Sequence, residues 1–345
     1  MVLAYKIKKD RVQRLKQILP IDYDYKPKKS KNFVYFAVDK RREYAKKIAE
    51  EDIEVLDVKL ERVKERPRSV RELLRKQGIK GLSSFEIIGD IAVFEPPKRL
   101  EDRPGLLKSV ADSIMRIHPR VKTVLCKEGG MKGAWRIRKL RLIKGENKTT
   151  TLYTENGCRF KLDLSKMYYS TRLATERKRI AELINDKKEN VLVPFAGYGP
   201  FAITIAKFNP SCKVVGIEIN PNAVRFFREN IRLNRLKNIE VLEGDAREII
   251  KKEFVKWADR IVMPLPKNTL EYLSEIIIGA KDICILHIYT FSDARRIFED
   301  VEEELNKRIS KEYSYEILYK RVVRPYSPDI SQVVFDIKTE RRQNK

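Results

Sequence analysis

Apolar runs and amphipathic segments alternate regularly over the carboxyl-terminal half of the chain. Short apolar runs lie at residues 190–193, 213–217, 239–242, 260–263 and 283–288. A segment of helical length separates each run from the next. Buried strands that alternate with helices are typical of a doubly wound α/β sheet. We therefore expect a Rossmann-like α/β domain over residues 164–345.

The beginning of the chain predicts a small α+β module over residues 1–62. Lys-rich segments of helical character surround one short apolar run at residues 33–38. A charged stretch that contains Pro67 follows, and such a stretch is typical of a linker.

A second α+β module is expected over residues 69–163. Ser69 is placed to cap a helix that ends at Gly78. Residues 85–94 form two strand-like runs around a Gly-Asp turn, which predicts a hairpin. A helix at residues 104–117 and a strand at residues 121–126 should follow. Residues 132–148 are rich in Lys and Arg, so this module should present a basic, strand-rich face.

A pair of glycines follows the first apolar run of the α/β domain. Gly197 and Gly199 lie between that run and a helical segment that begins near Pro200. In a doubly wound sheet this turn lies where ligands bind, and glycines let the backbone approach a ligand closely. An ordinary turn is the alternative interpretation of the pair.

Acidic residues follow the next two runs. Glu218 stands where a carboxylate accepts hydrogen bonds from both ribose hydroxyls of an adenosine. Asp245 follows the third run, where class I methyltransferases bind the adenine amino group, although a helix cap is the alternative. Phe201 occupies the place of the third glycine of a dinucleotide fingerprint, which argues against a nicotinamide cofactor. These positions together predict a methyltransferase that uses S-adenosylmethionine.

The fourth run ends in the sequence Met263-Pro264-Leu265-Pro266-Lys267. Methyltransferases that modify bases often carry an Asn- or Asp-Pro-Pro motif at this point, where it holds a planar nitrogenous substrate. A stiff loop is the alternative explanation of the two prolines. The position after the fourth strand favours a role in binding the substrate.

Charge indicates the class of partner. The 345 residues include 74 Lys and Arg against 49 Asp and Glu, a formal net charge of +25. Heat adaptation raises charges of both signs, and the 36% charged composition suits a thermophile, but an excess of one sign favours phosphate contacts. The sequence has no run of about 18 apolar residues and no apolar amino-terminal signal, so we expect no membrane partner and a cytoplasmic protein.

Cysteine and histidine are too sparse to predict a metal site. The four cysteines contain no CxxC pair, and the chain has only His118 and His287. We therefore expect no metal and no disulfide framework. We expect a monomer, because no coiled-coil seam is present.

The chain resembles the archaeal tRNA (guanine-37 N1)-methyltransferase family. The resemblance covers nearly all of the chain from the second module onward. The matching stretches are residues 85–92, 135–138, 168–177, 194–201 and 264–267.

The resemblance implies a first domain that reads the tRNA elbow and a last domain that binds S-adenosylmethionine. Methylation of guanine N1 needs a proton acceptor and a cation near O6. The resemblance implies Glu176 for the first role and Arg136 or Arg138 for the second. It places Tyr168, Leu265 and Pro266 at the substrate base. The cofactor ligands implied are Phe195, Gly197, Gly199, Pro200, Glu218, Asp245, Arg172 and Pro264.

Pro264 departs from the Asn that is usual in the family. The resemblance is therefore closest to the subgroup that also methylates C7 of 4-demethylwyosine at position 37, in the wyosine pathway, and it implies tRNA for phenylalanine as the substrate. An enzyme limited to guanine 37 and a methyltransferase of ribosomal RNA are the enzyme alternatives. A noncatalytic RNA-binding protein would show a damaged cofactor loop, which the sequence lacks.

Overall fold

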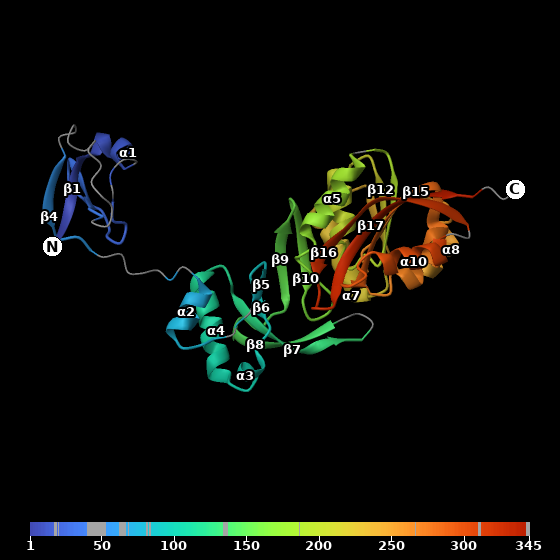
Figure 1. Ribbon diagram of the computed structural model, residues 1–345, viewed down its shortest axis with the longest axis horizontal. Helices are drawn as coiled ribbons and strands as arrows, with labels where there is room; N and C mark the ends of the chain where they lie inside the picture. Colours follow the sequence, from blue (N-terminus) through green and yellow to red (C-terminus); the bar gives the residue numbers. More distant parts are fainter. Residues whose placement is uncertain are drawn as a thin grey trace. The chain divides into compact units, whose positions relative to one another are not determined.

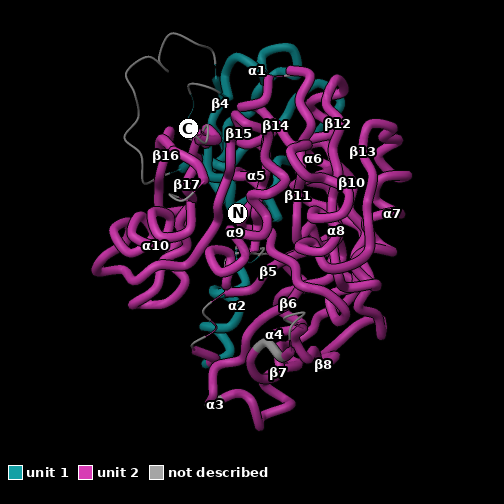
Figure 2. The backbone as a smooth tube through the Cα atoms, turned by 90° about the vertical axis from the view of Figure 1, so that its right-hand side faces the viewer, with its two compact units in different colours: residues 1–78 teal, residues 79–345 magenta. Residues whose placement is uncertain are grey.

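The computed structural model divides into two compact units, Met1–Gly78 and Ile79–Lys345 (Figure 2). The structure describes residues 1–16, 19, 21–39, 53–61, 67, 69–80, 82, 84–133, 137–185, 187–265, 267–309 and 312–342. Within these ranges, no helix is long and apolar enough to cross a membrane.

An antiparallel four-stranded sheet forms the centre of the first unit. Its strands, in spatial order, are β2 (Lys28–Lys29), β3 (Phe33–Ala37), β1 (Val2–Lys8) and β4 (Glu54–Val58). Among its described residues, this unit contains the helices α1 (Val12–Leu15) and α2 (Val70–Lys76), and Ser69 caps α2 as predicted. The helical character predicted for the start of the chain is wrong for β1, because Tyr5 and Ile7 alternate with lysines and pack against Val34.

A mixed sheet of order β5-β6-β7-β8 begins the second unit. It comprises β5 (Phe85–Ile88), β6 (Ile91–Phe94), β7 (Thr123–Lys132) and β8 (Ile137–Gly145), with α3 (Lys98–Glu101) and α4 (Pro104–Ile117). The predicted hairpin at Gly89 is confirmed, and a Cβ at that glycine would lie 2.2 Å from Thr151 Oγ1. The predicted helix at residues 104–117 is confirmed as α4.

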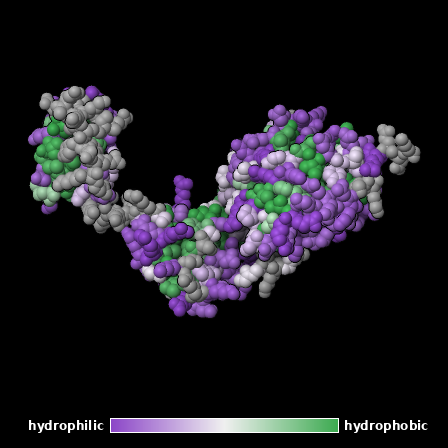
Figure 3. Space-filling view, viewed as in Figure 1, coloured by the Kyte–Doolittle hydropathy of each residue, from purple (hydrophilic) through white to green (hydrophobic). Residues whose placement is uncertain are grey.

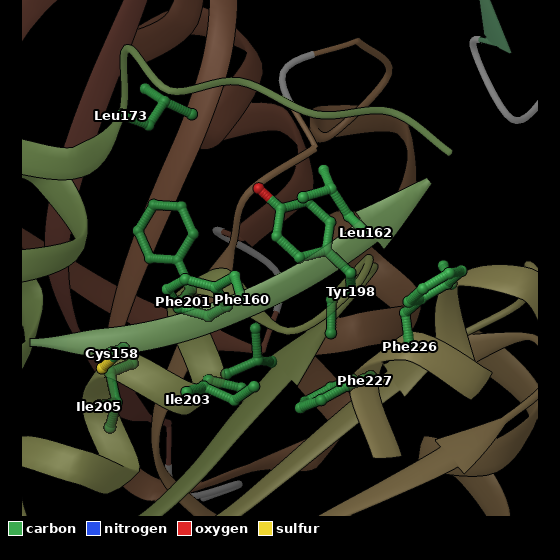
Figure 4. Close-up of a cluster of buried hydrophobic side chains, with 14 of the residues drawn as sticks. Cys158, Phe160, Leu162, Leu173, Tyr198, Phe201, Ile203, Ile205, Phe226 and Phe227 are labelled. Carbon is green, nitrogen blue, oxygen red and sulfur yellow. The ribbon is translucent and has the colours of Figure 1, made fainter. Parts of the chain in front are cut away.

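An antiparallel hairpin connects this sheet to the α/β domain. Its strands are β9 (Thr150–Glu155) and β10 (Cys158–Asp163). Phe160 of β10 packs with Tyr198 and Phe201 in a continuous apolar core (Figure 4). The amides of Asn230 and Asn234 hydrogen bond to the backbone of β10 at Lys161 and Arg159, so the hairpin is fixed to a helix of the α/β domain.

The predicted α/β sheet is confirmed as a seven-stranded sheet of order β13-β12-β11-β14-β15-β17-β16. Figure 1 labels β12, β15, β16 and β17 of this sheet. The strands are β11 (Asn190–Pro194), β12 (Lys213–Glu218), β13 (Ile239–Glu243), β14 (Ala258–Met263), β15 (Ala280–Asp293), β16 (Tyr313–Pro325) and β17 (Ile330–Arg341). The first five are parallel, whereas β17 is antiparallel to both of its neighbours. The long pair β16 and β17 was not predicted.

Helices cover both faces of this sheet. One apolar cluster joins the sheet to α5 (Ala174–Ile184), α6 (Pro200–Phe208) and α7 (Pro221–Leu233). The other joins it to α8 (Ala246–Glu253), α9 (Leu273–Ile276) and α10 (Glu299–Ile309). Successive residues Val191, Leu192 and Val193 alternate between the two clusters, as the pleat of a strand requires. Hydrophilic residues dominate the visible outer surface of this unit (Figure 3).

Substitution of Gly199 should test how tightly the loop after β11 is packed. Gly199→Ala places a Cβ 2.3 Å from Phe227 Cδ2 at a φ of +90°, so strain and overpacking should together cost about 2–4 kcal/mol of unfolding free energy. Gly157→Ala is the control, because its φ is +73° but no atom lies within 4 Å of the new Cβ. Denaturant unfolding that shows equal losses for both variants would contradict the packing argument.

Candidate functional site

A cavity of about 300 Å³ opens at the carboxyl ends of the first parallel strands. We call it the strand-end cavity. Parallel strands bring the residues that follow them to one edge of the sheet, which is where ligands bind in this fold. Its lining includes the predicted residues Tyr168, Phe195, Gly197, Glu218, Asp245, Pro264 and Leu265.

Glu218 is held rigidly at the end of β12. Its Oε2 accepts a hydrogen bond from the Gly197 N–H at 2.8 Å, and its Oε1 accepts one from the Asn220 N–H at 2.8 Å. Burial raises the pKa of Glu218, and these backbone donors oppose the rise. Each carboxylate oxygen keeps further acceptor capacity toward the cavity. The residue is therefore oriented to accept hydrogen bonds from paired hydroxyls.

The loop after β11 takes an unusual backbone path. Gly197 has a φ of +59°, and a Cβ built on it would meet no atom within 4 Å, so the backbone itself faces open space. Phe195 has a φ of +58°, which is strained for a residue with a side chain, and its ring lies 5.4 Å from that of Tyr272. Strain of this kind is typical of ligand sites.

The position of Asp245 allows both functions that the sequence suggested, a helix cap and a ligand of the adenine amino group. Its carboxylate caps α8 by accepting from the Arg247 N–H at 2.9 Å, and it also lines the strand-end cavity. The Arg247 guanidinium pairs with the same carboxylate and lies over the Tyr272 ring. Hydrogen bonding to Arg247 lowers the pKa of Asp245. The carboxylate is thus ionised and fixed in place.

A second cavity, of about 350 Å³, is lined from both the β5-β6-β7-β8 sheet and the α/β domain. We call it the polar cavity. Its lining includes the cationic side chains of Lys127, Arg138, Arg172 and Arg324. Burial and the neighbouring Arg138 lower the pKa of Lys127.

The predicted cofactor ligand Arg172 lines the polar cavity and does not line the strand-end cavity. Its guanidinium pairs with Glu86 at 3.0 Å, which draws it toward β5. Arg138 lies in the same cavity, 3.9 Å from Glu95. The structure therefore brings Arg138 and Arg172 together in the polar cavity, which shares Tyr168 with the cavity of the predicted adenosine ligands.

Tyr168 lines both cavities, and also a small third cavity of about 60 Å³. Pro200, Phe201 and Pro264 line this third cavity as well. A group held there would contact the glycine loop after β11 and the loop after β14. Tyr168 is therefore the residue at which the three spaces meet.

Glu176 lies in the first turn of α5, with a side chain that is only 1% exposed. Its Oε2 accepts from Tyr289 at 2.8 Å and from Arg179 at 2.9 and 3.0 Å, and its Oε1 accepts from Arg321. Helical spacing suggested an ion pair between Glu176 and Arg172, but Glu176 binds these other partners instead. Glu176 does not line any of the three cavities described above.

The network around Glu176 continues into the sheet. Arg179 also binds Asp336 of β17, and Asp336 Oδ1 lies 2.7 Å from His287 Nδ1. His287 Nε2 in turn lies 2.7 Å from Arg260 Nη1. Burial lowers the pKa of His287, although Asp336 opposes this effect. The imidazole is therefore neutral near pH 7, donating to Asp336 and accepting from Arg260.

Two predicted site residues, Arg136 and Pro266, lie outside the described residues. Several lining residues were missed by sequence reasoning. Ile219 and Asn220 follow Glu218 directly and could have been found from that position. Tyr272 gives no local signal, because it reaches the cavity from the 3-10 helix Leu270–Tyr272. Within the described ranges, no group of three or more His, Cys, Asp or Glu residues is arranged to hold a metal ion.

Two family models match adjacent parts of the chain. The model described as the TRM5/TYW2 methyltransferase domain matches residues 151–318. The model described as the TYW2 N-terminal domain matches residues 68–149.

Curated relatives match over most of the chain. The tRNA (guanine(37)-N(1))-methyltransferase Trm5b of Pyrococcus abyssi is 37% identical, over 94% of this chain and 94% of its own length. The tRNA (guanine(37)-N(1))/4-demethylwyosine(37)-methyltransferase Taw22 of Nanoarchaeum equitans is 31% identical, over 70% of this chain and 97% of its own.

Solved structures share the fold. The crystal structure of Trm5b from Pyrococcus abyssi has a TM-score of 0.79 and 34% identity, covering 99% of this chain and 100% of its own. The complex of aTrm5 with tRNALeu has a TM-score of 0.78 and 27% identity, with 97% and 99% covered. TYW2 of M. jannaschii in complex with AdoMet has a TM-score of 0.58 and 28% identity, with 75% and 100% covered.

His287 should make the stability of the chain fall in mild acid. Because its pKa is lower in the folded chain, the unfolded chain binds more protons below about pH 6.5, and stability is lost as the pH falls. His287→Asn keeps a donor and an acceptor but does not titrate in this range. Unfolding free energies at about pH 7.5 and 5.5 should therefore differ more in the wild type than in His287→Asn. Equal differences would contradict this assignment.

Proposed function

The chain belongs to the TRM5/TYW2 methyltransferase family, and from this premise we propose that it methylates N1 of guanine 37 in a transfer RNA. S-adenosylmethionine is the donor. The observation that carries the proposal is that Tyr168 lines both the strand-end cavity, which we assign to the adenosine of the donor, and the polar cavity, which has cations in its lining. Similarity to Trm5b over 94% of the chain supports the choice of base, and the tRNA complex of a structural relative supports the choice of RNA.

The strand-end cavity fits the methyl donor. Glu218 accepts from the ribose hydroxyls, Asp245 accepts from the adenine amino group, and Gly197 lets the backbone approach the ligand. When bound, S-adenosylmethionine supplies a methyl group activated by a positively charged sulfur. Phe195 and Pro264 border both this cavity and the small third cavity, so they are assigned to the methyl end of the donor.

The substrate base is assigned to the side of Tyr168 that faces the polar cavity. An extruded RNA base stacks favourably on an aromatic ring, and cations bind the flanking phosphates. Of the two predicted arginines, only Arg138 lies within the described residues, and we assign it to stabilise the negative charge that develops on O6. Leu265 and Pro266 are assigned to the edge of the base.

Glu176 is assigned the removal of the N1 proton. In the free chain its carboxylate is occupied by Arg179 and Arg321. The Arg321 side chain is 38% exposed, whereas that of Arg179 is 20% exposed. Arg321 is therefore the partner that leaves Glu176 more easily when RNA binds, since its charge can be compensated by a phosphate.

Pro264 extends the proposal to a second base. It has no side-chain amide to grip guanine, so the pocket is less selective and also accepts 4-demethylwyosine, which is methylated at C7. The similarity to Taw22 supports this dual activity. We further propose tRNA for phenylalanine as the substrate, and tRNA elbow binding as the role of residues 1–62. We assign residues 69–163 to a middle domain and residues 164–345 to the methyltransferase domain. We also propose that the protein is a monomer, that it acts inside the cell and that it needs no metal.

The function is tested with labelled S-adenosylmethionine on two substrates. These are unmodified tRNA for phenylalanine and the same tRNA carrying 4-demethylwyosine, with nucleoside analysis of the products. Label at N1 of guanine 37 and at C7 of 4-demethylwyosine is expected. Label on guanine alone would remove the second activity, and label on neither would favour a ribosomal RNA substrate.

Glu218 should dominate donor affinity in the strand-end cavity. Glu218→Gln removes charge-assisted hydrogen bonds to the ribose, which should weaken S-adenosylmethionine binding about 10- to 100-fold. Glu243→Gln is a matched control, because Glu243 ends the neighbouring β13 and pairs with Arg228 outside the cavity. Calorimetric titration that gives the same affinity for both variants would overturn the ribose assignment.

A further inference from the structure

Glu176 is connected to the sheet by a chain of buried charges that extends well beyond its immediate partners. From this chain we propose that Asp336 is a positioning residue for proton transfer, which holds Glu176 through Arg179. The proposal rests on the role assigned to Glu176 above. Asp336 itself lines none of the three cavities.

One guanidinium bridges the two carboxylates. Arg179 Nη1 lies 2.5 Å from Asp336 Oδ2, and Nη2 lies 3.3 Å from Asp336 Oδ1. Its Nε and Nη2 also donate to Glu176 Oε2, at 3.0 and 2.9 Å. A planar guanidinium held on two sides has a single orientation, so it transmits the position of one carboxylate to the other.

Asp336 is itself fixed by the sheet. His287 and Asp336 are direct partners in the register of β15 and β17, and His287 Nδ1 lies 2.7 Å from Asp336 Oδ1. Burial opposes ionisation of Asp336, but hydrogen bonds from His287 and Arg179 outweigh it and hold the pKa of Asp336 at about 2. Asp336 therefore carries a full negative charge near neutral pH.

The far end of the network is anchored as firmly. Arg260 of β14 donates to His287 and pairs with Glu189 through Nε at 2.7 Å and Nη2 at 3.1 Å. Asp336, His287 and Arg260 are all less than 5% exposed. Buried charges cost free energy relative to apolar packing of the same volume, so stability alone is a weak reason for this arrangement.

Sharing of Arg179 also sets the electrostatics at Glu176. The groups that face the Glu176 carboxylate are Arg179 on its own helix, Tyr289 on β15 and Arg321 on β16, with Asp336 on β17 behind Arg179. Asp336 neutralises part of the Arg179 charge. Without Asp336, the whole charge of Arg179 acts on Glu176, and the guanidinium loses the partner that fixes its orientation.

The test compares kcat for methyl transfer in the full chain. Asp336→Asn should lower kcat on the order of 10- to 100-fold, because loss of the positioning partner misplaces the base. Asp282→Asn is the matched control: Asp282 lies on β15 of the same sheet, pairs with Lys256 and has a side chain that is 77% exposed. Its kcat should stay unchanged.

A second variant covers the case in which Asp336→Asn fails to fold. Arg179→Lys keeps the charge but lacks the fork that reaches both carboxylates, so it should lower kcat on the order of 10-fold or more. Equilibrium binding of S-adenosylmethionine, unchanged from the wild type, shows for each variant that the donor site is folded. The KM for the donor should also stay unchanged.

The outcomes separate the two levels of the hypothesis. If Glu176→Gln removes activity while folded Asp336→Asn and Arg179→Lys keep the wild-type kcat, the positioning role of Asp336 is wrong. A lower kcat in Asp336→Asn accompanied by weaker binding of S-adenosylmethionine would also overturn it, because a general structural defect would then explain the loss. If Glu176→Gln keeps full activity, or the wild type transfers no methyl group to guanine 37, the proposed function fails instead.

Discussion

The register of the parallel strands β11, β12, β13 and β14 is the constraint on which the site depends. Pro194 lies opposite Ile217, and Glu218 lies opposite Glu243, so the residues that follow these strands emerge at one edge. The Gly197 N–H then reaches Glu218 across the gap between β11 and β12. A shift of one residue in either strand would turn that carboxylate to the other face of the sheet and separate it from the loop.

Two kinds of interaction hold the site, and they act on different parts of it. Backbone N–H groups and a left-handed loop fix the strand-end cavity, whereas long charged side chains fix the position of α5 and Glu176. The first kind joins residues at the ends of β11 and β12 only. The second kind requires β15, β16 and β17 to be in place, because Tyr289, Arg321 and Asp336 come from those strands.

Local rules explain what the sequence predicted well. The spacing of apolar runs was sufficient to place the parallel strands. A position at or just after a strand end was sufficient to place Glu218 and Asp245 at the strand-end cavity, because both depend on a few neighbouring residues. The positions of Arg172 and Glu176 depend on partners that are distant in the sequence. Tyr289 lies 113 residues from its partner Glu176, and Asp336 lies 157 residues from its partner Arg179. Helical spacing offered Arg172 as the partner of Glu176, but tertiary contacts with Glu86 and Arg321 prevailed.

The fixing of β10 by Asn230 and Asn234 has a consequence for the order in which the chain folds. The backbone groups of Arg159 and Lys161 are bound by amides that lie 75 and 69 residues later. During synthesis the hairpin leaves the ribosome well before α7, and water must solvate those groups until the helix is made. A boundary in the sequence near Leu164 is therefore not a boundary in folding, since the hairpin completes its hydrogen bonds only with the sheet that follows it.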